Sequence, residues 1–555
     1  MRTAREREPP LIRPGSELRE AWKAELFAQD HNYSGFSGPK SDHDRLVMME
    51  RASAYVQAII DNALSDLGGS FDAPELRGQQ PVLARLVAFN PLSWDRDDVV
   101  EVELPLDAGT TGAVVVDGQG HAQEVQVEGR VLTFPARGIP ALGCRAYDLV
   151  PPGSEKHPPL PDAVPGSRAS WLEELAGDDR VTIETPWFRA ALSRGRGCIE
   201  SLVCKTLKRE LVRPAGPRVF GELVSYEDTG PDVRYRFTGA VGRDSAVPYG
   251  LRRVRSGPLS ATWAFEGCFN NARVEKLVTL HRDLPHIDLE IVVYWWGQRN
   301  TQVRLCLPFA AEDFSQTWYG VPFHAVRWPT MMDGIEDSVI LGMESNPDEL
   351  AAEDRRHFRE AVAWVDVGYR AYGVTVAVMQ PGLWIDGALL EIPLVRSNRS
   401  CGDPTVWPDN SGRRSWSFRL LPHTGDWRSA RGWRTGWELN SPVVVRALAA
   451  ADRSEAKAGS SAGPVMPSSF FRVGQDNVVI TAVKAADDGT TDVILRYYEA
   501  EGTAGTVSIE CCRPVVEAAE TDLLEQPVAR LETRGCRVFA PTRPHQIKTV
   551  RLTLA

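Results

Sequence analysis

Residues 272–296, ARVEKLVTLHRDLPHIDLEIVVYWW, decide the fold class of this chain. Two apolar runs flank the triplet Asp283-Leu284-Pro285, and this pattern predicts two strands joined by a turn. From Pro81 onward, similar short runs recur between Gly, Pro and Asp residues almost to the end of the chain. No repeat of fixed period accompanies them. The sequence therefore predicts a mainly β protein.

Two helices are expected before the strands begin. The segment SELREAWKAELFAQ, residues 16–29, offers Ser16 as an N-cap and places Leu18, Trp22 and Leu26 on one stripe. The second helix, residues 41–69, opens with Ser41, keeps an apolar stripe and ends at Gly68-Gly69. Its stripe consists of Met48, Ala52, Tyr55, Ile59, Ala63 and Leu67. A helical hairpin of this kind needs a third helix or a sheet to cover it.

Length and composition suggest three or four domains, because single cores rarely exceed about 250 to 300 residues. The strand patterns, separated by two linkers rich in Pro or in Gly and Ser, give the expected division. It is a helical segment at 1–72, a small β-sandwich at 73–150, a Pro-rich linker at 151–180, a large β-supersandwich at 181–450, a second linker at 451–468 and a C-terminal β-unit at 469–555.

Charge and cysteine content narrow the partners and the compartment. The net charge is −11 and no block of Lys and Arg occurs, which argues against nucleic acid as a partner. No apolar run reaches about 18 residues, and the first residues lack the apolar core of a signal peptide, so no membrane partner is expected. The 9 cysteines show no zinc-type spacing. Reduced thiols in a cytoplasmic protein are the expected state.

Histidines and carboxylates cluster at the quoted turn. In His281-x-Asp283-x-x-His286-x-Asp288, alternation along each strand puts His281 with Asp283 and His286 with Asp288 on shared faces. Metal binding could use this spacing, but the plain strand pattern from Leu289 to Trp296 favours an ordinary strand turn, a polar hairpin without a ligand.

Two further stretches are candidates for a site. Residues 26–45, LFAQDHNYSGFSGPKSDHDR, place Asp30, His31, Asn32 and Tyr33 directly after the first helix. They suit a metal or a sugar, or they are surface and capping residues. One imidazole cannot hold zinc, which takes three or four protein ligands. The second stretch, residues 396–404, is a polar loop that is either functional or a solvated turn. Among the 16 tryptophans, some could stack on sugar rings, although in a large sandwich most belong to the core.

Several segments, in order, resemble glycoside hydrolase family 38, the class II α-mannosidases. They are LFAQDHNYSG, VAFNPLSWDRDDVVEVELP, GIPALGCRAYDLV, TPWFRAALSRGRGCIESLVCKTLKRELV, AWVDVGYRAYGVTV, EIPLVRSNRSCGDP, SWSFRLLPHTGDWR, NVVITAVKAADDGTTDVILRYYEAEG and VEAAETDLLEQ. The resemblance implies a three-helix bundle, of which the helical hairpin is a remnant, followed by a small β-sandwich and a galactose-mutarotase-like supersandwich. In the family a (β/α) barrel precedes these parts.

The resemblance also implies a site. The family holds zinc with two Asp and two His, one Asp being the nucleophile of a retaining mechanism through a glycosyl-enzyme intermediate. By this likeness His31 is the fourth zinc ligand, and Asp30, Asn32 and Tyr33 lie beside the sugar. Arg396 and Asp403 are expected to form a pair at the pocket rim, on the same side of the molecule as His31, or only a clasp that closes their loop.

The barrel is the point of departure from the family. It needs roughly 200 to 250 residues, and only thirty precede His31. His286-x-Asp288 has the letters of the family's His-x-Asp motif but falls in the supersandwich region, so it is not taken for that motif. We expect the nucleophile and the other ligands on a separate barrel chain or in upstream sequence, an inactive chain alone, and a mannoside glycan as ligand. A non-catalytic carbohydrate-binding or structural module, a truncated product and a homo-oligomer stay open.

Overall fold

The structure is a computed structural model of the 555-residue chain. It describes residues 16–30, 39–70, 82–104, 113–119, 121–151, 171–177, 179–213, 216–229, 237–328, 358–379, 382–399, 405, 407, 411–449 and 469–555. Most of the described residues lie in antiparallel strands, which confirms the predicted mainly β fold.

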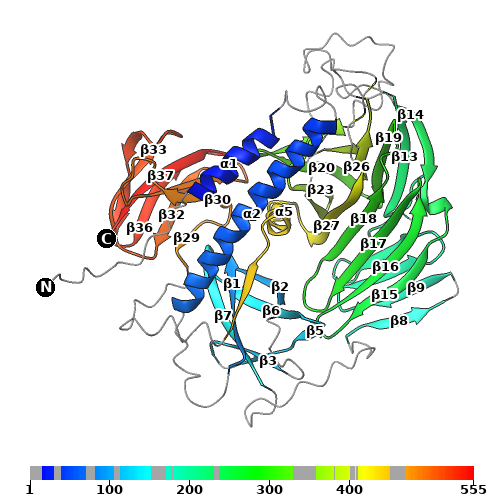
Figure 1. Cartoon of the computed structure of the whole chain (residues 1–555), viewed down its shortest axis with the longest axis horizontal. Coiled ribbons are helices and arrows are strands. Elements are labelled where there is room, and N and C mark those ends of the chain that lie inside the picture. The colour runs from blue at the N-terminus through cyan, green and yellow to red at the C-terminus, as the bar shows by residue number, and fades with distance from the viewer. Residues whose placement is uncertain are drawn as a thin grey trace.

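A helical hairpin crosses the front of the molecule in Figure 1 and consists of α1 (Ser16–Ala28) and α2 (Pro39–Ser70). The buried side chains of α1 are alanines, Ala21, Ala24 and Ala28, whose small size lets α2 approach closely. Trp22 and Leu26 of the stripe predicted for α1 are 60% and 67% exposed, so neither α2 nor any described sheet of this chain covers them. No described helix combines the length and the hydropathy that spanning a bilayer requires.

The small sandwich lies beneath the hairpin, and Leu67 of α2 packs against it. One sheet contains, in spatial order, β28 (Val444–Ala449), β1 (Ala84–Asn90), β7 (Gly143–Val150), β3 (Val114–Asp117) and β4 (Ala122–Gln123). The facing sheet contains β2 (Arg96–Glu103), β6 (Val131–Ile139) and β5 (Gln126–Glu128). A shared apolar core fills the space between them.

The strand β28 corrects the predicted division of the chain. It falls inside the range 181–450 assigned to the large sandwich, yet it pairs with β1, Ala84 opposite Ala449. The chain thus returns to complete the small sandwich, because the outer edge of β1 offers unpaired backbone groups that an apolar strand can satisfy. The apolar pattern of a strand does not indicate which sheet edge the strand will pair with.

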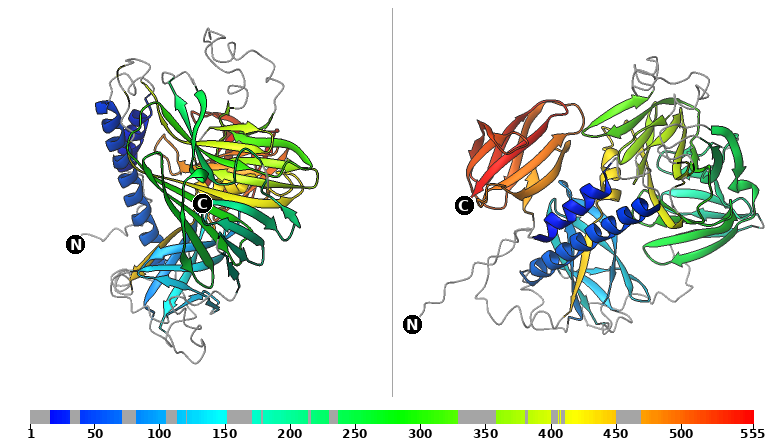
Figure 2. Two further views of the ribbon diagram at one scale, coloured as in Figure 1. Left: turned by 90° about the vertical axis from the view of Figure 1, so that its right-hand side faces the viewer. Right: turned by 45° about the horizontal axis from the view of Figure 1, so that its top comes forward.

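The large sandwich has three antiparallel sheets around one core (Figure 2). The first sheet contains β15 (Gly250–Ser256), β16 (Ser260–Phe269), β17 (Ala272–His281), β18 (Ile287–Trp295), β27 (Gly412–Thr424), β24 (Tyr372–Val378), β23 (Trp364–Tyr369), β20 (Phe314–Val321) and β21 (His324–Trp328). The second contains β14 (Phe237–Arg243), β13 (Glu222–Asp228), β19 (Thr301–Pro308), β26 (Leu389–Ser397), β25 (Leu383–Asp386) and β22 (Phe358–Arg359).

The third sheet contains β12 (Arg209–Glu210), β11 (Cys198–Cys204), β10 (Phe188–Ser193), β9 (Arg180–Glu184) and β8 (Glu173–Ala176). The predicted linker at 151–180 is therefore too long, because β8 and the start of β9 lie within it. Leu172 and Val181 join the main core, and this burial draws the end of the Pro-rich segment into the sandwich.

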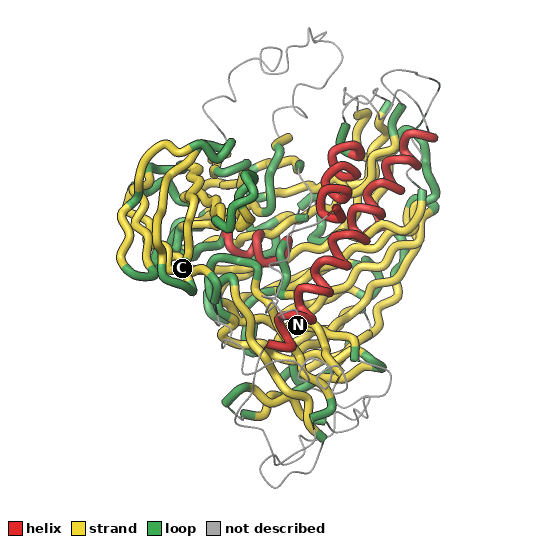
Figure 3. Tube along the Cα trace, turned by 60° about the vertical axis from the view of Figure 1, so that its left-hand side comes forward, coloured by secondary structure: helices red, strands yellow, loops and turns green. Residues whose placement is uncertain are grey.

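The C-terminal unit is a separate two-sheet sandwich with its own core (Figure 3). One sheet contains β29 (Phe471–Val473), β32 (Gly505–Cys511), β36 (Arg537–Thr542) and β35 (Glu532–Arg534). The other contains β30 (Val478–Ala485), β31 (Val493–Glu499), β37 (Ile547–Leu554), β33 (Val515–Thr521) and β34 (Pro527–Arg530). Helix α5 (Trp433–Asn440) and a cluster that includes Trp94, Trp364, Trp427 and Tyr498 join the three sandwiches.

Candidate functional site

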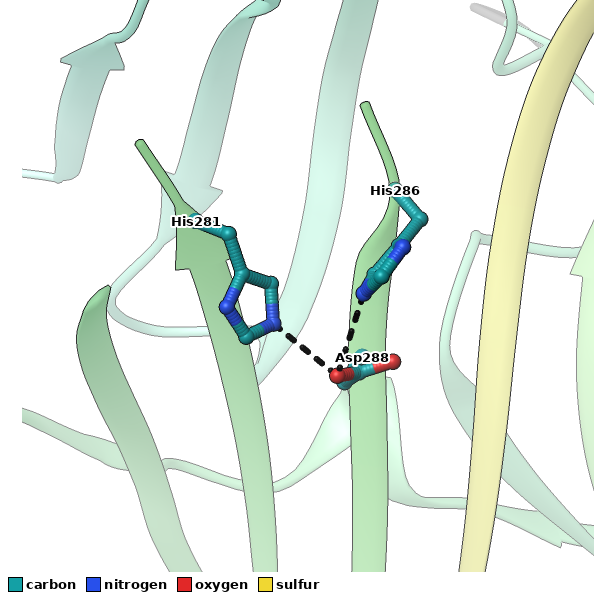
Figure 4. Close-up of side chains that lie close together, drawn as sticks. All are labelled: His281, His286 and Asp288. Atoms are coloured by element: carbon teal, nitrogen blue, oxygen red, sulfur yellow. Dashed lines mark hydrogen bonds and ion pairs between the residues drawn. The ribbon is translucent and has the colours of Figure 1, made fainter. Parts of the chain in front are cut away.

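Three of the four residues singled out at the turn in 272–296 come together. His281 ends β17, while His286 and Asp288 stand on either side of the first residue of β18. Nε2 of His281 lies 2.9 Å from Oδ2 of Asp288, and Nε2 of His286 lies 3.6 Å from the same oxygen (Figure 4). Both imidazoles are buried. Their ring centroids are 4.9 Å apart.

Strand alternation explains why these side chains meet. Leu280 and Ile287 point into the core of the large sandwich, so His281 and Asp288 project from the opposite face of the nine-stranded sheet. Asp288 is paired across the sheet with Arg419 of β27. That face looks toward the small sandwich.

Arg419 sets the charge state of the cluster. Its Nε donates to Oδ1 of Asp288 at 2.7 Å, and a terminal nitrogen donates to Oδ2 at 3.2 Å. Burial alone would raise the pKa of Asp288, but Arg419 holds that pKa well below its usual range. Burial, reinforced by Arg419, lowers the pKa of His286 to about 4. At pH 7 the cluster thus contains a carboxylate and a neutral His286.

Asp283, the fourth residue of the predicted pattern, lies outside the cluster. Its carboxylate binds Arg282 and Arg137, with Arg137 at 2.7 Å. These charged side chains line an open cleft of about 450 Å³ between the small and large sandwiches. The lining residues are Asp97, Asp98, Val99, Pro135, Arg137, Pro186, Trp187, Arg282, Asp283 and Leu284. The prediction that His281 and Asp283 share one face of a strand is wrong. The strand β17 ends at His281, so the alternation of side chains stops there.

The stretch after the first helix is only partly described. Asp30 follows α1, is exposed, and its amide donates to the carbonyl of Phe27 at 3.2 Å. His31, Asn32 and Tyr33 lie outside the described residues, so their predicted roles stay predictions. In Figure 1 the end of α1 that precedes Asp30 lies in the upper part of the view, as does β26, which carries Arg396.

Arg396 has a buried carboxylate partner that the sequence did not identify. Its Nε donates to Oδ2 of Asp228 at 2.6 Å, and Asp228 is completely buried at the end of β13. The expected partner, Asp403, lies outside the described residues. The sequence did indicate that Arg396 needs a carboxylate partner, because this arginine ends an apolar strand. Its partner was hidden because β13 and β26 are separated by β19 in the sheet and by more than 150 residues in the chain.

Comparison with known proteins identifies the relatives. Residues 477–550 match the family described as "Glycosyl hydrolases family 38 C-terminal beta sandwich domain". Alpha-mannosidase 2C1 of Homo sapiens is 22% identical over 560 residues, which cover 99% of this chain and 46% of that protein. The chain is related to glycoside hydrolase family 38. Alpha-mannosidase G of Dictyostelium discoideum is 19% identical over 84% of this chain and 40% of its own length.

A solved structure shares the fold of this chain. The crystal structure of an alpha-mannosidase from Enterococcus faecalis V583 superposes with a TM-score of 0.71 and 14% identity. The match covers 97% of this chain and 64% of that one. The chain thus spans about half the length of the curated α-mannosidases that it matches.

This chain has a second polar cluster, which the sequence did not reveal. Glu391 of β26 accepts hydrogen bonds from Arg218 Nε, the Tyr226 hydroxyl and Arg304 Nη1 at 2.9 to 3.1 Å. Burial alone would raise the pKa of Glu391, but the two guanidinium groups lower it. Arg304 lies within the apolar strand β19, and this position could have indicated a buried carboxylate partner.

An exposed apolar surface covers part of the helical hairpin. Leu46, Met49 and Val56 of α2 share one face at helical spacing, and all three are exposed. We call the exposed large apolar side chains of the two helices the helical surface; they are Trp22, Leu26, Phe27, Leu46, Val47, Met49 and Val56. Large contiguous apolar patches on soluble proteins usually mark interaction sites.

Proposed function

We propose that this chain is the helical and β-sandwich part of an α-mannosidase-type glycoside hydrolase and that it binds a catalytic barrel through the helical surface. The proposed reaction is hydrolysis of an α-mannoside with retention, through a glycosyl-enzyme intermediate on a barrel carboxylate. The relationship to α-mannosidases supports the substrate class. A mannoside glycan is therefore the proposed ligand of the assembled protein, and the cytoplasm its proposed location.

The helical surface is the observation that carries the proposal. Trp22 and Leu26 stand on the solvent side of α1, while its alanines face α2. Exposing large apolar side chains costs free energy, at about 25 cal/mol for each Å² left in water. A barrel packed on this surface would remove that cost, and it would lie next to Asp30 and the residues after it.

A zinc ion at the segment after α1 would need most of its ligands from the barrel. His31 lies outside the described residues, and Asp30 alone offers one carboxylate, whereas zinc takes three or four protein ligands. No catalytic step is therefore assigned to the metal at this segment. Asp30 and Arg396 are proposed to contact the sugar once a barrel closes the site, with Asn32, Tyr33 and Asp403 as the further expected contacts.

The test measures barrel binding and hydrolysis separately. The chain is mixed with a family 38 catalytic barrel supplied as a second polypeptide, and complex formation is followed by sedimentation and by hydrolysis of an aryl α-mannoside. We expect no turnover by the chain alone and turnover by the complex. Replacing Trp22 and Leu26 with Ser should weaken the complex by at least tenfold.

Leu524 provides the matched control, because it is 80% exposed but lies in the C-terminal unit. Leu524→Ser should leave the complex intact. Hydrolysis by the chain alone, or an unchanged complex in the Trp22 and Leu26 double variant, would contradict the proposal. Binding of mannan by the chain without any barrel would favour a non-catalytic carbohydrate-binding protein instead.

A further inference from the structure

We propose that His281, His286 and Asp288 form a binding site for a divalent transition-metal ion, with zinc as the best match to the donor set. The site holds the turn between β17 and β18 and is independent of the residues around Asp30. Within the described part of the chain, these residues are the only group of three or more His, Cys, Asp or Glu whose ligand atoms all lie within 4.8 Å of one another.

The distances suit a tetrahedral ion. Zinc binds imidazole nitrogen and carboxylate oxygen at about 2.0 to 2.2 Å, so two ligands of a tetrahedral site stand about 3.3 Å apart. The observed separations from Oδ2 of Asp288 are 2.9 Å to His281 and 3.6 Å to His286, on either side of that value. Figure 4 shows both Nε2 atoms directed at the same carboxylate oxygen.

An unsatisfied nitrogen gives a second, independent indication. Nε2 of His286, which faces the proposed ion, is buried and makes no hydrogen bond to a described residue. Orphaned buried polar atoms are rare and call for a missing partner. A metal ion would accept the lone pair of His286 Nε2. It would also replace the proton that His281 now donates to Asp288, and that proton would move to Nδ1 or to solvent.

Arg419 is compatible with this role. It takes Oδ1 of Asp288 at the shorter distance and thereby orients Oδ2 toward the two imidazoles, as outer partners of metal ligands commonly do. The other charged groups near Arg419 are Asp98 and Glu438, which offset its positive charge. The Asp288 side chain is 27% exposed, so water can reach the fourth position.

The donor set favours particular ions. Two imidazoles and one carboxylate suit zinc and similar late first-row metals, whereas magnesium and calcium prefer sites made entirely of oxygen. The three ligands come from the end of β17, from the turn and from the start of β18. A bound ion would therefore hold the β17–β18 hairpin closed.

The experiment titrates the full chain, stripped with EDTA, with Zn²⁺ against a competing chromophoric chelator and with Co²⁺ by its visible absorption. We expect one site, an intense tetrahedral Co²⁺ spectrum, and a rise in melting temperature with Zn²⁺. His286→Gln should weaken Zn²⁺ at this site at least tenfold and abolish the spectrum. Mg²⁺ should not compete.

Controls separate this site from other histidines. His324 and His545 form another close pair, with ring centroids 4.0 Å apart, so His324→Gln should bind Zn²⁺ like the unaltered chain. His281→Gln is the second test variant, used together with circular dichroism in case His286→Gln does not fold. Equal Zn²⁺ affinity in the unaltered chain and both ligand variants, or no tetrahedral Co²⁺ spectrum, would overturn the proposal.

Discussion

The buried ion pair between Lys276 and Asp244 provides a strong test of what holds the large sandwich together. Nζ of Lys276 lies 2.8 Å from Oδ2 of Asp244, and the two side chains are 4% and 0% exposed. The carboxylate also accepts hydrogen bonds from the Leu223 amide and the Tyr249 hydroxyl, at 2.8 and 3.0 Å. Lys276 donates further to the carbonyl of Gly221. Three parts of the sandwich thus meet at one pair of charges.

Lys276→Met keeps most of the aliphatic length but removes the ammonium group. Breaking a buried pair by removing one partner costs about 3 to 5 kcal/mol, because the remaining charge stays buried without compensation. Two hydrogen bonds still reach Asp244, so we expect the lower end, about 3 kcal/mol. With an m value of about 3 kcal/mol/M, the urea midpoint of the large-sandwich transition should fall by about 1 M. Tryptophan fluorescence follows that transition.

The double variant decides whether charge is the cause. Adding Asp244→Asn to Lys276→Met removes the stranded carboxylate and should recover about half or more of the lost free energy. Lys23→Met, which breaks an exposed pair with Glu20 on α1, should leave the urea midpoint unchanged, because solvent screens this pair. If Lys276→Met unfolds at the same urea concentration as the unaltered chain, the reasoning is refuted.

Two other features give sharp expectations. Burial alone would lower the pKa of His423, but Asp366, whose carboxylate lies 2.7 Å away, raises it, so this pair stabilises the fold below pH about 6.5 and less as pH rises through the folded pKa. His423→Gln should therefore destabilise the chain more at pH 5.5 than at pH 9 in thermal melts, and an equal effect at both would contradict this. Gly436→Ala should cost about 1 to 3 kcal/mol by urea denaturation, since its Cβ would lie 2.5 Å from the Ala363 carbonyl, whereas Gly505→Ala meets nothing within 4 Å and should be nearly neutral.

The sequence predicted local structure better than it predicted which strands pair with one another. The turn in 272–296 lies where the pattern put it, between β17 and β18, because Asp and Pro interrupt two apolar runs. The pairing of β28 with β1 was not predictable in the same way. Strand patterns report which side chains are buried, while the choice of edge depends on backbone groups that all strands share.

Site residues followed the same rule. The pattern at the β17–β18 turn named His281, Asp283, His286 and Asp288 together, and the structure brings three of them within 4.8 Å of one another but not Asp283. Arg419, which fixes the charge of Asp288, lies 131 residues away in the chain and enters only through the β18–β27 pairing. Local spacing can therefore suggest a ligand set but cannot supply the outer partner that tunes it.

Helix α1 shows why amphipathic periodicity alone does not name a packing face. Its large apolar side chains and its alanines occupy different sides, and both sides repeat with helical spacing. The alanine side packs on α2 because small side chains allow the two backbones to approach closely. Trp22 and Leu26 are then left for a larger surface to cover. An apolar stripe that the chain itself does not cover is the signature expected of a surface that binds a partner.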